Sequence, residues 1–348
     1  MLRPCTLLSN SEALVPARPV QRGLPGYVVA ITVAVALTMF AAWADAGDGP
    51  RQPETTRRPK CVQNPLWSND ARASSYDFGC KEIEEFLQGH KIFLGNGLVR
   101  DAYLVDYKGK SVVIKTLQNV PDEKRRYQRL KQHHAEVAAL DAVRGNHNVV
   151  GLLGVCNTTI ATEYCSADVS DMLLQPEGRL PVSTVVPMAL DAARGLQALH
   201  EAPGGPIVHF DLRPKQLMLD DNGKVKINDL NMARFIEINA STGDPCSFRA
   251  RRPTKIVPWR APENMAGDQN LTEKVDIYSM GMIFFSLTSG KIPFGQDPNS
   301  AKKILKGEKP AFDTYWPAEY MELVQDMWCR EPKDRPSAAQ VVARLENL

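Results

Sequence analysis

Three charged side chains have the types and the spacing that transfer of a phosphoryl group requires. Asp211 follows a histidine in the segment 208–219 (VHFDLRPKQLML), where a carboxylate can orient an acceptor hydroxyl and accept its proton. Asp229 comes shortly after the run KVKI and can bind a divalent metal ion. Lys115 ends the run VVIK and can reach the phosphates of a nucleotide. The sequence therefore predicts Asp211 and Lys115 as catalytic residues and Asp229 as a ligand of a metal ion and its nucleotide.

The elements that must position these groups begin with a glycine-containing turn. Gly95 and Gly97 would let the backbone of a β-hairpin approach the phosphates closely. Arg100 stands where a third glycine is usual in such loops. A charged helix is expected over about 121–143, and Glu136 on it has a suitable separation to hold the lysine by an ion pair. We expect Gly95, Gly97 and Glu136 to belong to the nucleotide site.

The base of the nucleotide needs a connecting strand with free backbone groups. The segment 162–165 (TEYC) resembles the connection between the two lobes of protein kinases, and this resemblance implies that backbone groups of Glu163 and Cys165 bond the adenine ring. Val113 is expected above the ring and Met218 below it. Every connecting strand has backbone groups, so the side chains of this segment do not identify it by themselves.

Three further segments carry a resemblance to the protein kinase family. Glu263 in WRAPE, Asp276 in KVDIYSMG and Arg335 in EPKDRPS match positions that support the catalytic loop and the larger lobe in that family. All of the motifs occur in the family's order over about 89–348. The resemblance implies an α+β bilobal fold, with a small β-rich N-lobe and a larger helical C-lobe. It also implies ATP and Mg²⁺ (or Mn²⁺) as cofactors.

Four positions depart from the family pattern. Arg100 replaces a glycine, and Phe210 replaces the arginine that often binds a phosphorylated activation loop. Gln216 replaces the metal-binding asparagine, but its amide oxygen keeps it a candidate metal ligand. Asn231 replaces the glycine of D-F-G. These departures leave open a pseudokinase that acts as a scaffold.

The composition is that of a globular protein. The chain has 348 residues, of which 43% are hydrophobic and 24% charged. The formal net charge of +2 is too small to indicate a nucleic-acid partner, and we predict none.

The apolar segment 27–44 is long enough to cross most of a bilayer core, and we predict that it is an uncleaved transmembrane anchor. A cleavable signal peptide is the alternative, because the sequence ADA at 44–46 resembles a cleavage site. With the anchor, 1–26 would be a cytosolic tail and 45–60 a luminal stem rich in Pro, Gly and charge. A collar over 61–88 would precede the large domain over 89–348.

Cysteines and glycosylation sequons indicate on which side of the membrane the domain lies. An even number of cysteines follows the anchor, which suits disulfides in an oxidising compartment, with the pairing left open. The cysteines are Cys61, Cys80, Cys156, Cys165, Cys246 and Cys329. Sequons occur at Asn157, Asn239 and Asn270, which are glycosylated only on the luminal side. Both features favour a luminal domain, hence a single-pass type II protein.

Among proteins with a protein-kinase-like fold, the chain resembles the protein O-mannose kinases over essentially its full length. The resemblance is carried by the short tail, the anchor, the collar and the loops HFDLRPKQLML and INDLNMARF. It implies phosphorylation of the 6-hydroxyl of an O-linked mannose, within a GalNAc–GlcNAc–mannose trisaccharide on α-dystroglycan, as needed for the laminin-binding glycan. The implied location is the endoplasmic reticulum membrane with a luminal kinase domain. A luminal pseudokinase scaffold and a protein-directed Ser/Thr/Tyr kinase are the alternatives.

Overall fold

The computed structural model describes residues 61–62, 76–97, 99–173, 180–253, 258–295, 297–312 and 316–348. All of these belong to one compact unit. The expected anchor over 27–44 lies outside the described residues, as do the tail and the stem. Among the helices in the described part of the chain, none has the length and apolar character needed to span a bilayer.

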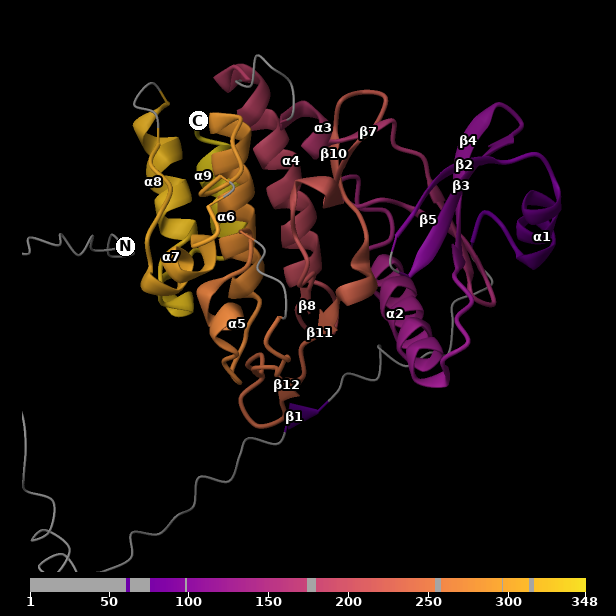
Figure 1. Cartoon of the computed structure of the whole chain (residues 1–348), viewed down its shortest axis with the longest axis horizontal. Helices are drawn as coiled ribbons and strands as arrows, with labels where there is room; N and C mark the ends of the chain where they lie inside the picture. Colours follow the sequence, from indigo (N-terminus) through magenta and orange to yellow (C-terminus); the bar gives the residue numbers. More distant parts are fainter. Residues whose placement is uncertain are drawn as a thin grey trace, which may run out of the picture. The chain divides into compact units, whose positions relative to one another are not determined.

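The N-lobe is built on a five-stranded antiparallel sheet with the strand order β2-β3-β4-β6-β5 (Figure 1). The central strand β4 buries Val112, Val113 and Ile114 in succession, which means that both faces of the sheet are covered there. Helix α2 packs against strands β4 and β5 of this sheet, and the shorter helix α1 packs against β4, β5 and β6. The bounds are α1 Cys80–Gln88, β2 Ile92–Asn96, β3 Arg100–Tyr107, β4 Lys110–Leu117, α2 Glu123–Ala142, β5 Leu152–Cys156 and β6 Thr159–Glu163.

The collar residues 76–88 form part of the N-lobe. Ile83 and Phe86 lie on one face of α1 and are buried in a small core of their own under the sheet. A disulfide between Cys80 and Cys156 joins the first turn of α1 to β5. The collar thus contains a short helix that is fastened to the sheet.

The C-lobe is mostly helical. Its centre is α6, in which every residue from Val275 to Ser289 is buried, as expected of a helix that is mostly apolar on all sides. The helices Val182–His200 and Ala318–Met327 pack beside it (Figure 1). The helices of this lobe are α3 Val169–Leu173, α4 Val182–His200, α5 Pro262–Ala266, α6 Lys274–Ser289, α7 Ser300–Lys306, α8 Ala318–Met327 and α9 Ala338–Leu345.

Short antiparallel strand pairs hold the loops that carry the predicted chemistry. One pair, Leu217–Leu219 with Val225–Ile227, leads into the segment of Asp229. Another, Ile207–Val208 with Arg234–Phe235, encloses both the catalytic loop and that segment. Short 3-10 helices at Pro214–Gln216 and Leu230–Met232 complete these loops. The short strands are β1 Cys61–Val62, β7 Ala167–Asp168, β8 Ile207–Val208, β9 Leu217–Leu219, β10 Val225–Ile227, β11 Arg234–Phe235 and β12 Ile238–Asn239.

A glycine on α4 determines how closely β10 approaches that helix. A Cβ atom on Gly195 would lie 2.3 Å from the backbone oxygen of Asn148. The same oxygen accepts a hydrogen bond of 2.9 Å from the backbone N–H of Ile227, the last residue of β10. Only glycine at this position allows the contact, and β10 in turn leads directly into Asp229.

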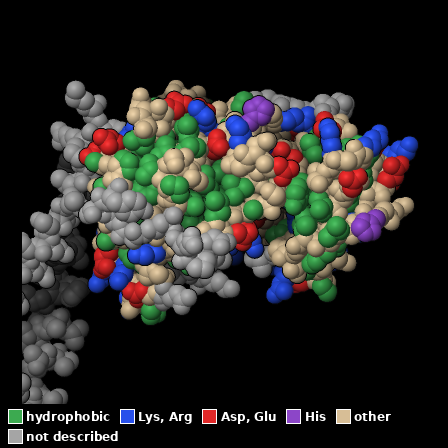
Figure 2. All heavy atoms as spheres, turned by 90° about the horizontal axis from the view of Figure 1, so that it is seen from above, with side chains coloured by type: hydrophobic (Ala, Val, Ile, Leu, Met, Phe, Trp, Pro, Cys, Tyr) green, Lys and Arg blue, Asp and Glu red, His purple; other side chains and the backbone are tan. Residues whose placement is uncertain are grey.

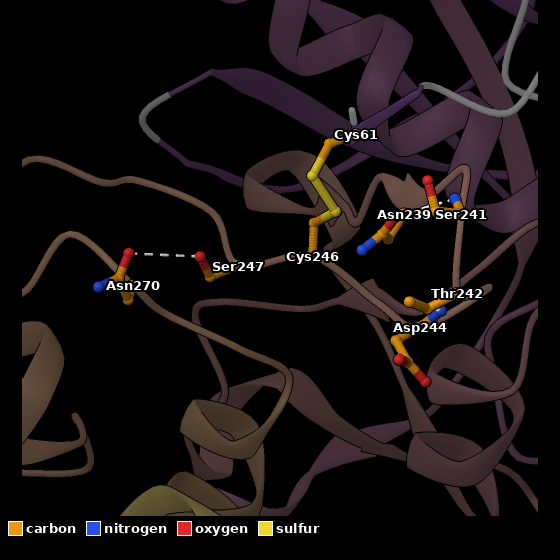
Figure 3. Close-up of a disulfide and its surroundings, with 8 residues drawn as sticks. All are labelled: Cys61, Asn239, Ser241, Thr242, Asp244, Cys246, Ser247 and Asn270. Carbon is orange, nitrogen blue, oxygen red and sulfur yellow. Dashed lines mark hydrogen bonds between the residues drawn. A yellow bond between two sulfur atoms is a disulfide. The ribbon is translucent and has the colours of Figure 1, made fainter. Parts of the chain in front are cut away.

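The N-terminal strand β1 is attached to the segment that follows the predicted metal-binding loop. Cys61 pairs with Asn239 of β12 and forms a disulfide with Cys246 (Figure 3). The sequon residue Asn270 accepts a hydrogen bond of 3.4 Å from the hydroxyl of Ser247, which directly follows Cys246 (Figure 3). Two predicted sequons thus lie on either side of this disulfide.

The bilobal α+β fold expected from the sequence is confirmed. On the face drawn in Figure 2, side chains of Lys and Arg are interspersed with those of Asp and Glu rather than gathered in one field of a single sign. That distribution agrees with the small net charge of +2.

Candidate active site

A cavity of about 580 Å³ is lined by residues of both lobes. Its walls come from the glycine turn, β4, α2, the end of β6, the catalytic loop and the segment of Asp229. The structure brings every predicted catalytic, nucleotide-binding and metal-binding residue to this one cavity. They are Gly95, Gly97, Val113, Lys115, Glu136, Glu163, Cys165, Asp211, Gln216, Met218 and Asp229.

Lys115 on β4 of the N-lobe contacts residues of both lobes. Its Nζ is 3.5 Å from Oε1 of Glu136 and donates a hydrogen bond of 2.9 Å to Oδ1 of Asn228. Burial alone would raise the pKa of Glu136, but the charges of Lys115 and Arg100 outweigh it and hold the pKa below its ordinary value. Glu136 is therefore a carboxylate at neutral pH, able to hold a lysine in place.

Arg100, the residue that replaces the third glycine, points into the N-lobe and is only 7% exposed. Its Nε donates to Oε2 of Glu136 over 2.7 Å, and its Nη1 donates to the backbone oxygen of Thr158 over 3.1 Å. The substitution that suggested a degenerate loop thus supplies a buried cation for Glu136. Arg100 is one of the residues whose function the sequence did not reveal.

His133 completes the surroundings of Arg100. Nη2 of Arg100 lies 2.5 Å from Nδ1 of the histidine, and a guanidinium can only donate. Nδ1 must then be the unprotonated nitrogen, while Nε2–H donates to the backbone oxygen of Asn157 over 2.9 Å. Burial and the charge of Arg100 lower the pKa of His133 to about 4. The histidine is neutral at physiological pH and adds no competing positive charge.

Asp229 and Gln216 have the chemistry of a site for a hard divalent cation. Nε2 of Gln216 donates to Oδ2 of Asp229 over 3.1 Å, which leaves the amide oxygen as a further acceptor. Burial raises the pKa of Asp229, and the negative charge of Glu136 raises it further. A carboxylate in surroundings that disfavour its charge is stabilised by a bound cation. Mg²⁺ prefers such oxygen ligands.

The metal site is not a preformed cage of side chains. Within the described part of the chain, no group of three or more His, Cys, Asp or Glu side chains is placed to hold a metal ion. A site of this kind fits Mg²⁺ bound with a nucleotide, because one or two protein ligands together with substrate phosphates are its usual coordination.

Asp211 is flanked by two arginines. Nη2 of Arg260 donates to its Oδ1 over 2.9 Å, and Nη2 of Arg213 lies 3.6 Å from its Oδ2. Both arginines line the cavity. They place positive charge beside Asp211 in the cavity, and positive charge of this kind can stabilise a transferred phosphoryl group.

The catalytic loop is held by Asp276, as its motif predicts. The two carboxylate oxygens accept from the backbone N–H groups of His209, over 2.6 Å, and Phe210, over 2.9 Å. Phe210 has φ = 68° and Asp229 has φ = 64°, a left-handed conformation that costs free energy in residues other than glycine. The buried Asp276 supplies the hydrogen bonds that keep Phe210 of the catalytic loop in this conformation.

Phe210 also shows what replaces the arginine of the usual motif. Its ring packs edge to face against Phe248, with the guanidinium groups of Arg234 and Arg260 5.3 and 5.5 Å from the ring centroid. Phe248 and Arg260 belong to the activation segment, which runs from Asp229 to Glu263. This segment therefore contacts the aromatic ring of Phe210.

Glu263 and Arg335 form a buried, two-pronged ion pair in the C-lobe. Nη1 and Nη2 of the arginine lie 2.6 and 2.8 Å from the two carboxylate oxygens. Arg335 also donates to the backbone oxygens of Cys329 and Lys274, so its charge is fully partnered. This pair fixes α5, and hence the end of the segment that carries Arg260.

The connection between the lobes is tied to the strand that precedes Asp229. The carboxylate of Glu163 accepts hydrogen bonds of 2.9 and 3.0 Å from Nζ of Lys226 in β10, and one of 2.6 Å from the backbone N–H of Gly151. Cys165 is free and buried, and burial raises the pKa of its thiol to about 12. This thiol therefore stays protonated at neutral pH.

Sequence reasoning missed Arg213, Asn228 and Arg260 as residues of the cavity. Each stands inside or beside a segment that was identified: Arg213 follows Asp211, Asn228 precedes Asp229, and Arg260 lies in WRAPE. Their nearness to those motifs was the only available signal, since none of them is a position that the motif itself specifies.

Comparisons with known proteins agree with this geometry. The family model described as "Protein kinase domain" matches residues 90–345. "Integrin-linked protein kinase 1" of Arabidopsis thaliana is 28% identical over 311 residues, covering 86% of this chain and 61% of that protein. "Dual specificity protein kinase shkA" of Dictyostelium discoideum is 28% identical over 288 residues, covering 80% of this chain and 52% of that protein.

A third relative, "Serine/threonine-protein kinase 12" of Arabidopsis thaliana, is 28% identical over 253 residues, covering 70% of this chain and 52% of that protein. The chain thus spans between about half and three fifths of the length of these relatives. The family model, by contrast, matches well over half of the chain, from the glycine turn to the last helix. The chain therefore belongs to the protein kinase domain family, whose members transfer the γ-phosphoryl group of ATP with the help of a divalent metal ion.

Proposed function

We propose that this kinase acts in the lumen of the endoplasmic reticulum, as a single-pass type II membrane protein, and phosphorylates a glycan. The proposed acceptor is the 6-hydroxyl of an O-linked mannose in a GalNAc–GlcNAc–mannose trisaccharide on α-dystroglycan. The luminal assignment rests on the disulfides Cys61–Cys246 and Cys80–Cys156 between described residues of the kinase domain.

Disulfides of this kind are a mark of an oxidising compartment. One joins α1 to β5 within the N-lobe, and the other joins the N-terminal strand β1 to the loop that follows β12. Protein disulfides form and persist in the secretory pathway and are rare in the cytosol. The sequon residues Asn157 and Asn270 are exposed and Asn239 is partly exposed, which supports glycosylation at these positions. The proposed acceptor, an O-linked glycan, would be in the same luminal compartment as this domain.

The cavity supports transfer rather than binding alone. We propose that Asp211 orients the acceptor hydroxyl and accepts its proton, and that Lys115 binds the phosphates. Asp229 and Gln216 would hold Mg²⁺, which neutralises charge on the nucleotide when bound. Arg260 and Arg213 would stabilise the charge of the transferred group. With these groups together in one cavity, an active kinase is favoured over a pseudokinase scaffold.

A protein-directed kinase is the second candidate. It is favoured by the names of the relatives, which include serine/threonine and dual-specificity protein kinases. Both candidates use the same cleft, ATP and base, and they differ only in the acceptor. The choice between them therefore has to come from the acceptor itself.

An acceptor assay tests the proposal directly. The full chain would be incubated with labelled Mg-ATP and one of three acceptors: a peptide carrying the trisaccharide, the same glycopeptide with 6-deoxymannose, or unglycosylated peptides rich in Ser, Thr and Tyr. We expect label only on the first, because only it offers the 6-hydroxyl. Label on the deoxy glycopeptide would show another acceptor atom, and label confined to the plain peptides would establish the protein-directed alternative.

A further inference from the structure

Asn228 joins the ATP-binding lysine to the catalytic loop. Its Oδ1 accepts a hydrogen bond of 2.9 Å from Nζ of Lys115 on β4. Its backbone oxygen accepts from Nε2 of His209 over 2.9 Å, and its backbone N–H donates to the oxygen of Gln216 over 2.9 Å. One residue of the C-lobe therefore contacts the N-lobe lysine and two residues of the catalytic loop.

The chemistry of its neighbours determines which atoms of Asn228 make these contacts. An ammonium group has only donors, so the side-chain atom that faces Lys115 must be the amide oxygen. Nδ1 of His209 accepts from the backbone N–H of Asp211 over 3.3 Å, which leaves Nε2 as the protonated nitrogen. Nε2–H then donates to the backbone oxygen of Asn228. The donors and acceptors match along the whole path from Lys115 to Asp211.

Glu136 is shared between Lys115 and Arg100 and lies closer to Arg100. Its Oε2 is 2.7 Å from Nε of Arg100, whereas its Oε1 is 3.5 Å from Nζ of Lys115. Arg100 is thus the nearer cation for this carboxylate, and Asn228 provides the shorter contact for the lysine. The three donor positions of an ammonium allow Lys115 to keep both contacts and still donate to a phosphate.

We propose that Asn228 is the residue that positions Lys115 for ATP, and that Glu136 is chiefly the partner of Arg100. The side-chain oxygen of Asn228 holds the lysine at a fixed place relative to His209 and Asp211. This contact keeps the lysine at a fixed distance from the catalytic loop. This role concerns ATP only, so it does not depend on the identity of the acceptor.

The test measures the affinity of the full chain for Mg-ATP by isothermal titration calorimetry. Asn228→Leu keeps a similar volume and removes the oxygen, and we expect it to raise the Kd for Mg-ATP about tenfold, or about 1.4 kcal/mol. The matched control is Asn347→Leu, at an exposed position outside the cavity, which should leave the Kd within about twofold of the wild type. If Asn228→Leu does not fold, Asn228→Ala removes the same oxygen without added bulk and has the same expected effect.

A double-mutant cycle separates positioning from a general structural effect. In the Lys115→Met background, Asn228→Leu should change the Kd by less than about twofold, because the two side chains act through one contact. The KM of the acceptor should not change in Asn228→Leu. An unchanged Kd in the single variant, or a further loss of about tenfold in the Lys115→Met background, would overturn the proposal.

Discussion

Asp211→Asn is expected to lower kcat for phosphoryl transfer by at least about a thousandfold, while the Kd for Mg-ATP stays within about threefold of the wild type. The amide has nearly the shape of the carboxylate, but it cannot accept the proton of the acceptor hydroxyl. It also removes the negative charge that holds Arg260 at 2.9 Å and Arg213 at 3.6 Å. Single-turnover measurement of labelled phosphate transfer separates the chemical step from binding.

Asp268→Asn is the matched control for this variant, because Asp268 is exposed and lies outside the cavity. It should retain the wild-type rate. If Asp211→Asn kept more than about a tenth of the wild-type kcat, another group would have to accept the proton, and the assignment of the base would be wrong.

Arg100→Gly restores the glycine that is usual in the family's loop, yet we expect it to destabilise the protein by about 3–5 kcal/mol. The change leaves the buried carboxylate of Glu136 with only Lys115, at 3.5 Å, as a cationic partner. It also removes the hydrogen bond to the backbone oxygen of Thr158. Urea denaturation of the variant and of the wild type would give the difference in the free energy of unfolding.

The control for this prediction is Asn96→Gly, which adds a glycine to the same turn at an exposed position and does not touch Glu136. Its expected cost is about 0.5–1 kcal/mol, the usual effect of glycine in a strand. Equal stability of Arg100→Gly and wild type would mean that the buried pair contributes nothing to folding, contrary to the role assigned to Arg100.

The elements of the fold could be predicted because their sequences carry strong local patterns. The long apolar run of α6 and the charged run of α2 are typical of a buried and of a surface helix. The β-branched run before Lys115 is typical of a central strand. The site could be predicted from the motifs, because Asp211 and Asp229 each follow a short strand and the fold brings them to one cavity.

The remaining features depend on side-chain direction and on distant partners. Nothing near Arg100 in the sequence indicates that its guanidinium reaches back to Glu136, because that contact requires β3 and α2 to be packed together. The contact of Arg260 with Asp211 likewise requires the activation segment to fold over the catalytic loop. The disulfide partners were left open for the same reason, since Cys61 and Cys246 are 185 residues apart in sequence.

The claim on which the rest depends is that Lys115, Asp211 and Asp229 converge on a metal-bound triphosphate. The most direct measurement is the thermal shift of the full chain on adding ATP, with and without Mg²⁺, in the wild type and in Lys115→Ala. We predict that Mg-ATP raises the melting temperature of the wild type by several degrees, and that Lys115→Ala loses this gain. No shift in the wild type, or the same shift in Lys115→Ala, would contradict the account.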